Sequence, residues 1–175
     1  MPKIPTAGPL PDPLPASFTA TLVATVHCTV EHGLLDDGRA EVEESGVAFR
    51  AHVDGGTVRV VGFPEIEAEV GTSLGQVRCV VSVDGEPEGD YDAATGHAHV
   101  SAELSFDPKS LFASTSRVAV RLESEARLAD PKATGDPLDA GDDRVTLVGE
   151  GTFDGGSLDG GRLGLVLDCR IEAVE

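Results

Sequence analysis

Two histidines one residue apart, His97 and His99, are the side chains of this chain best suited to bind a metal ion. Alternate residues of a β-strand project from the same face, so a His-x-His pair on a strand can present two imidazoles to one ion. Glu103 has the same parity and adds a carboxylate. The spacing predicts a candidate site for a divalent metal at His97, His99 and Glu103.

The spacing His-x-His-x-x-x-Glu over residues 97–103 resembles the first motif of the cupin family, in which it binds a transition metal on a barrel strand. The resemblance implies a cupin-like metal site. It covers these seven residues only, without the glycines that bracket the family motif and without a second motif. His27 and His52 could join the cluster if their strands were neighbours. The alternative is a set of solvated histidines, because residues 97 and 99 have the opposite parity to the apolar residues around them.

Acidic side chains gather in two further segments, which suggests calcium as another cation. They are Asp130, Asp136, Asp139, Asp142 and Asp143 in one segment, and Asp154 and Asp159 in the other. Neither segment matches an EF-hand loop, and Asp-Gly turns need no metal to explain them. Apart from such a divalent cation, we expect no cofactor.

Nucleophilic catalysis finds no support in the sequence. No nucleophile-elbow pattern occurs, and Cys28, Cys79 and Cys169 are each in phase with apolar residues, which predicts buried and reduced thiols. We therefore favour a protein that is not an enzyme.

The elements that carry these residues are predicted to be strands. Alternating apolar and polar residues fill the chain between turns, most strictly over residues 18–30. Five Asp-Gly dipeptides supply the positive φ angles of tight hairpins. This pattern predicts an all-β fold: an antiparallel β-sandwich or jelly-roll-like domain of about nine or ten strands, with a closed β-barrel as the alternative. Residues 38–44 suggest a short edge strand, and residues 107–112 one turn of helix.

An extended arm precedes this domain. Six prolines within the first fifteen residues exclude both a helix and a central strand. We expect a Pro-rich N-terminal arm over residues 1–16 and a single all-β domain over residues 17–175. Ile4, Leu10 and Leu14 are spaced to anchor the arm on another subunit or on the edge of its own sheet.

The net charge of the chain limits the classes of partner that it can bind. With 31 acidic and 13 basic residues, its formal net charge is -18, which repels nucleic acid and anionic lipid. We therefore expect no nucleic-acid partner and no membrane association. No signal peptide is visible, so a cytoplasmic or particle-associated location is expected.

Three functions are compatible with these observations. The first is a non-enzymatic structural or accessory subunit of a larger assembly, in contact with other protein subunits as a homo-oligomer or a mixed particle. The alternative is a β-barrel that binds a small apolar ligand, as a carrier or in the manner of a cyclase or isomerase. The second alternative is the cupin-like metal site at His97 and His99.

Overall fold

A computed structural model describes residues 6–7, 10–11, 15–130 and 133–175. The predicted all-β fold is confirmed, since a single turn of 3-10 helix at Asp36–Gly38 is the only helical segment in the described chain. Within those residues, no helix has the length and apolar character needed to span a bilayer. The strands are β1 (Thr6–Ala7), β2 (Ser17–Glu31), β3 (Arg39–Asp54), β4 (Thr57–Val61), β5 (Ile66–Thr72), β6 (Gly75–Asp92), β7 (His97–Pro108), β8 (Ser116–Glu123), β9 (Arg144–Asp154) and β10 (Arg162–Val174).

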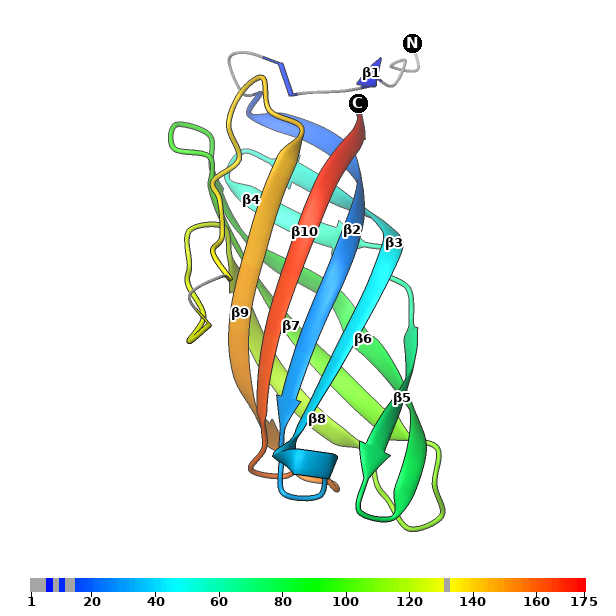
Figure 1. The fold of residues 1–175 in the computed structure, drawn as a ribbon. Helices are drawn as coiled ribbons and strands as arrows, with labels where there is room; N and C mark the ends of the chain where they lie inside the picture. Colours follow the sequence, from blue (N-terminus) through cyan, green and yellow to red (C-terminus); the bar gives the residue numbers. More distant parts are fainter. Residues whose placement is uncertain (1–5, 8–9, 12–14, 131–132) are drawn as a thin grey trace.

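The sheet closes on itself (Figure 1). Antiparallel pairing runs in the order β10-β2-β3-β4-β6-β7-β8-β9, and β9 pairs with β10 again. Eight strands thus form a closed barrel, with β5 added on β6 and β1 on β10. Of the two architectures predicted, the structure has the alternative, a closed barrel, and not a sandwich or jelly roll.

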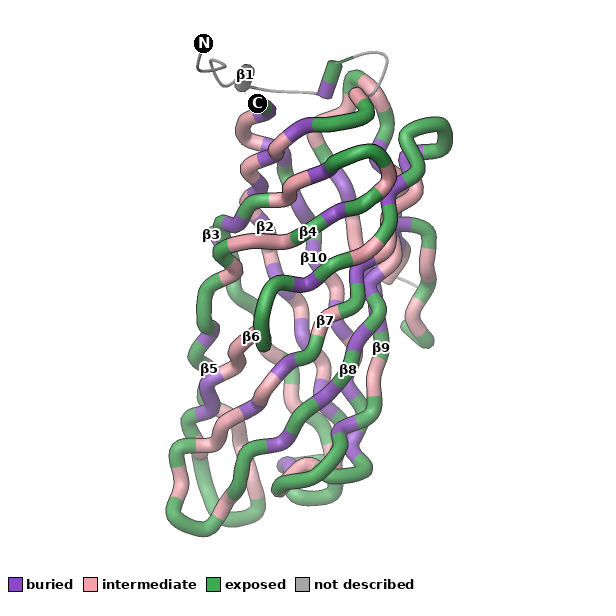
Figure 2. The backbone as a smooth tube through the Cα atoms, turned by 180° about the vertical axis from the view of Figure 1, so that it is seen from behind, coloured by how far each residue is buried: buried purple, intermediate pink, exposed green. Residues whose placement is uncertain are grey.

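The inward faces of the strands form the hydrophobic core. Along β2 every second residue from Phe18 to Val30 is buried, while the residues between them are half-buried (Figure 2). β10 repeats this alternation from Leu163 to Ile171. Cys28, Cys79 and Cys169 belong to the buried set and are unpaired, as the phase of each cysteine predicted.

Two glycines let β9 approach β8 where the ladder between these strands is interrupted. A Cβ atom on Gly149 would lie 2.6 Å from the carbonyl oxygen of Arg121, and one on Gly151 would lie 2.6 Å from that of Ala119. Such distances are far below van der Waals contact, so any side chain at these positions would push the two strands apart. Close approach of the backbones at this seam therefore requires glycine.

β4 and β5 are two pieces of one broken strand. Thr57 lies opposite Asp90, Ile66 opposite Val81, and Thr72 opposite Gly75, so both pieces keep one register on β6. Residues 62–65 interrupt the pairing: Gly62 has a φ of 74°, and the Pro64 nitrogen carries no hydrogen to donate. Within the described residues, no ladder joins residues 60–65 to β6, and β5 pairs with β6 but not with β3.

Two local predictions are wrong. Residues 39–44 are not a separate edge strand but the first part of β3, fully paired with β2. Residues 107–112 are not a helix, because β7 continues to Pro108 and the Lys109 amide still donates to the Arg78 carbonyl at 2.8 Å. Pairing with β6 holds residues 107–109 extended in spite of their helix-capping sequence, and residues 110–112 form a turn.

The described part of the N-terminal arm lies on its own barrel. β1 pairs with Ala173 and Val174 at the end of β10. Leu10 is buried, donates to the Asp142 carbonyl at 3.1 Å and accepts from the Gly141 amide at 2.9 Å. Ile4 and Leu14, the other two predicted anchors, lie outside the described residues.

Leu10→Ala should lower the free energy of unfolding by about 2–4 kcal/mol, because it removes a buried side chain and leaves a cavity. Urea denaturation measures the change. Leu111→Ala is the matched control: Leu111 is 98% exposed, and its replacement should shift stability by less than about 0.5 kcal/mol. Equal effects of the two substitutions would show that Leu10 does not anchor the arm.

Tyr91 is buried beside Phe18, with ring centroids 5.8 Å apart, and its hydroxyl has no hydrogen-bond partner among the described residues. Removing an unpaired buried hydroxyl relieves a desolvation cost of about 1–3 kcal/mol. Tyr91→Phe should therefore raise the thermal midpoint by a few degrees in a calorimetric scan. A lower midpoint would mean that the hydroxyl is bonded to a structural water.

Candidate ligand-binding cavity

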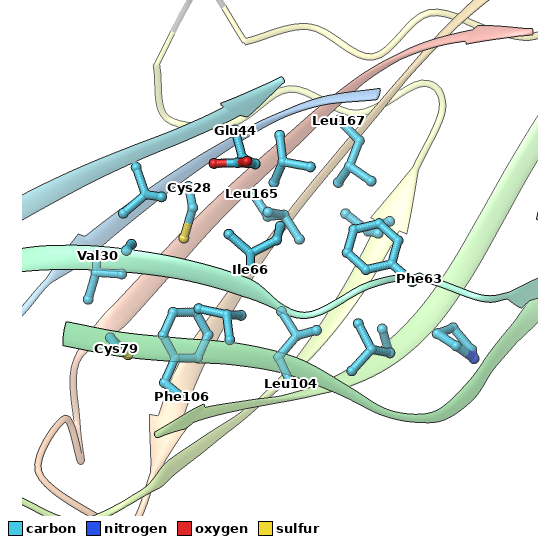
Figure 3. A pocket seen from close by; sticks show the side chains of 18 of the residues that line it. Cys28, Val30, Glu44, Phe63, Ile66, Cys79, Leu104, Phe106, Leu165 and Leu167 are labelled. Atoms are coloured by element: carbon cyan, nitrogen blue, oxygen red, sulfur yellow. The ribbon is translucent and has the colours of Figure 1, made fainter. Parts of the chain in front are cut away.

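The barrel lumen contains an apolar cavity of about 110 Å³. Side chains from β2, β3, β5, β6, β7 and β10 line it, and Figure 3 shows Val30, Ile66, Leu104, Phe106, Leu165 and Leu167 among them. Among the described residues on this lining, Glu44 alone carries a charge. The walls can thus offer dispersion contacts and exclusion of water to an apolar molecule, and one carboxylate to a polar group on it.

A stretch of the barrel wall beside this cavity, which we call the window, lacks strand pairing in the described chain. β3 pairs with β4 only from Arg50 onward, and in the described chain its first half has no strand partner on that side. An isolated bridge between Leu35 and Thr72 closes the lower end of the window. Phe49 and Phe63, with ring centroids 5.3 Å apart, pack together near its upper end. The window therefore lies between the first half of β3 and β5.

A β-bulge turns Glu44 toward the lumen. Val26 of β2 lies opposite Glu44, whereas Ala24 lies opposite Val47, so β3 contains one residue more than β2 at this point. Gly46, with a φ of 71°, supplies the unusual backbone conformation. Ala40, Val42 and Glu44 consequently share the inner face before the bulge, and Val47 begins the inner face after it.

The Glu44 side chain stands at the rim of the cavity. The residue is exposed and at the same time lines the cavity, which places it where the cavity meets solvent. Figure 3 shows Glu44 among the apolar side chains of the lining. Within the described chain, no hydrogen bond or ion pair joins its carboxylate to another side chain. The neighbouring Glu43 differs, since it faces outward and its carboxylate lies 3.3 Å from Nδ1 of His27.

Two of the three thiols, Cys28 and Cys79, line the cavity. Burial raises the pKa of Cys28 from an ordinary value of 9.0 to about 12, and the nearby Cys79 adds to the rise. Burial likewise raises the pKa of Cys79 to about 11 and that of Cys169 to about 12. These groups are neutral thiols at pH 7, so they act as apolar wall and not as nucleophiles.

The predicted metal ligands lie on the outer face of β7. His99 contacts Asp90 of β6, with Nε2 and Oδ2 3.2 Å apart. Glu103 lies four residues further along the strand, a distance of about 13 Å at the usual rise of a strand. His52 of β3 is hydrogen-bonded to Thr19 of β2, and His27 faces Glu43 and Asp168. The structure therefore does not bring the four histidines together, and the described residues contain no group of three or more ligands that could hold a metal ion.

The acidic loops use their carboxylates locally. Asp142 accepts from the amides of Asp143 and Arg144 at 2.7 and 3.2 Å, and Asp159 accepts from the Gly155 amide at 2.8 Å. Such bonds stabilise turns.

An open groove on the outside of the barrel is a second concave surface. Its floor is β2, β9 and β10, and its polar lining includes His27 between Glu43 and Asp168. The side chains of His27, Glu43 and Asp168 are 41%, 64% and 51% exposed, so solvent screens the contacts among these three residues.

One end of the barrel carries apolar side chains into solvent. Leu34 is 43% exposed, Leu74 82%, Leu111 98% and Phe112 88%. They lie on the loops β2–β3, β5–β6 and β7–β8, which meet at the same end (Figure 1). The Ser73 amide donates to the Leu34 carbonyl at 3.1 Å, so two of these loops touch.

Sequence analysis missed Glu44 and the window. The signal for Glu44 was its parity with Ala40 and Val42, which the low apolar content of residues 38–44 obscured. The signal for the window was Gly62 and Pro64 between two short apolar runs.

The raised thiol pKa values predict alkaline destabilisation. Each thiol is harder to ionise in the folded state than in the unfolded state. Its contribution to the free energy of unfolding is therefore complete below about pH 9 and is lost as pH rises toward 12. The loss is up to about 1.4 kcal/mol per pH unit for each thiol. Urea midpoints between pH 8 and 11 measure the decline. In Cys169→Ala, the free energy of unfolding should fall less steeply with pH, by up to about 1.4 kcal/mol per pH unit, which corresponds to one proton. An unchanged slope would contradict the raised pKa of Cys169.

Comparison of the chain with family models, with curated proteins and with solved structures finds no match. The cavity and its rim are therefore the features of this protein that indicate a function.

Proposed function

We propose that this protein binds a small apolar molecule inside its barrel and acts as a carrier or binding protein for it. The observation that carries the proposal is an apolar cavity in the lumen of a closed barrel, with a window in its wall. Eight-stranded barrels have interiors that are just wide enough to be filled by side chains or to hold one small ligand.

The size of the cavity sets the scale of the ligand. Its volume of about 110 Å³ approaches that of the engineered apolar cavity of about 150 Å³ that takes up benzene. Small residues leave this space: Ala40, Ala68 and Ala102 line it where larger side chains would fill it. A ligand of one ring or a short chain suits this space, and a second fused ring requires side chains of the lining to move apart.

The apolar end of the barrel supports the same proposal. Leu74, Leu111 and Phe112 extend into solvent at the end to which the cavity-lining residues Leu35 and Cys79 belong. Exposed apolar groups of this kind mark contact with another apolar surface. A carrier needs such a contact where it collects or releases its ligand.

The carrier function is preferred to catalysis and to a metal site. Among the described residues, the lumen contains neutral thiols and no general base except Glu44 at its rim, so a cyclase or isomerase activity would depend on shape alone. A cupin-like site at His97 and His99 has less support, because these side chains are outside the lumen. The role as a subunit of a larger assembly stays a prediction.

Naphthalene, an uncharged fluorescent hydrocarbon, tests the proposal directly, since the chain has no tryptophan that would mask its emission. The wild-type protein should bind it with one site. Ala102→Leu extends a side chain into the cavity and should weaken binding at least about tenfold, because the added atoms occupy the ligand's space.

Ala119→Leu is the matched control, because Ala119 lies on the exposed face of the adjacent β8. This variant should bind naphthalene as the wild type does. Both variants are first shown to be folded by circular dichroism. Binding that is equal in the two variants would place the hydrocarbon outside the lumen and refute the proposal.

A further inference from the structure

We infer that Glu44 selects ligands that carry a protonated amine on an apolar body. The inference rests on the proposed binding of an apolar ligand in the lumen and adds the chemical class of its polar head. The body of the ligand occupies the cavity, and the ammonium group lies at the window against the Glu44 carboxylate.

The backbone of β3 determines the position of Glu44 at the cavity. A glycine-containing bulge in β3 changes the inward parity, so that residue 44 takes an inner position opposite Val26. Without the bulge, the alternation that begins at Val47 would place Ser45 and not Glu44 on the inner face. The backbone thus directs one carboxylate toward an otherwise apolar wall.

The surroundings leave this carboxylate available. Its near neighbours on the cavity lining, Cys28, Phe63 and Leu165 among others, offer no positive charge (Figure 3). Of the other acidic side chains near the window, Glu43 faces His27 on the outer surface and Glu67 of β5 is paired with Arg78, whereas Glu65 and Glu69 are exposed and do not line the cavity. Among the described side chains, Glu44 has no partner that a ligand would need to displace.

The carboxylate of Glu44 then determines which head group of the ligand is preferred. An ionised carboxylate only accepts hydrogen bonds, so it favours N–H and O–H donors, and a cationic donor most strongly. A carboxylate head would instead be repelled by Glu44 and by a chain with a formal charge of -18. The order of preference is therefore ammonium, then hydroxyl, then carboxylate on the same apolar body.

Three ligands with one ring system and different heads test this order. They are 1-naphthylmethylamine, 1-naphthalenemethanol and 1-naphthoate, each titrated by its own fluorescence at low salt and neutral pH. The amine should bind the wild-type protein about tenfold more tightly than the alcohol, and the carboxylate should bind more weakly than the alcohol.

Two variants locate the origin of the preference. Glu44→Gln keeps the size of the side chain and removes its charge, and should bring the affinity of the amine down to that of the alcohol. Glu43→Gln removes one charge from the adjacent outward position and should leave the ratio between amine and alcohol unchanged. General attraction of a cation to an acidic surface would instead lower the ratio equally in both variants.

The outcomes separate this inference from the proposed function. If naphthalene binds but the amine and the alcohol bind equally, or if Glu44→Gln retains the preference, the role of Glu44 is refuted while the lumen site stands. If neither naphthalene nor any of the three ligands binds, the lumen site itself is refuted and the head-group preference with it. An amine preference that Glu44→Gln abolishes and Glu43→Gln preserves supports both.

Discussion

Closure of the sheet through β10 is the constraint on which the other features of this protein depend. β10 pairs along most of its length with β2 on one side and with β9 on the other, so the first and last long strands of the barrel both complete their backbone hydrogen bonds. Once the sheet is closed, the inward faces of eight strands meet in one lumen. The sizes of those inward side chains then decide how much space remains, and alanines at several positions leave a cavity.

Closure is incomplete at one place, and the interruption has two local causes. Gly62 and Pro64 break the strand that would have paired with all of β3, and the bulge at Gly46 shifts β3 itself. Within the described chain, part of the β3 edge is left without a strand partner, which costs ladder hydrogen bonds that water must replace. In exchange, the wall of the barrel has a window beside the cavity, which a fully paired eight-stranded barrel of this size would lack.

The distribution of charge follows from the same geometry. Polar groups on the outward faces are solvated and contact one another across strands, as His27 does with Glu43 and Asp168. Inward groups are apolar or remain neutral, as the raised pKa values of Cys28 and Cys79 illustrate. Glu44 is the exception because it lies where the inner face meets solvent, so its charge remains hydrated while it borders the apolar space. A molecule that fills the cavity would meet both environments at once.

Alternation and turn residues in the sequence determined that the chain forms antiparallel strands, which residues of β2 and β10 face inward, and that all three cysteines are buried. These properties depend on near neighbours in the chain, whose parity is written in the sequence. Whether the sheet closes depends instead on pairing between β2 and β10, which the whole chain separates, so only the tertiary structure decided between barrel and sandwich. It also decided that Glu44 borders the lumen, because a one-residue bulge in β3 reverses the faces of that strand without changing the local pattern. The outward position of His97 and His99, in contrast, follows from their parity.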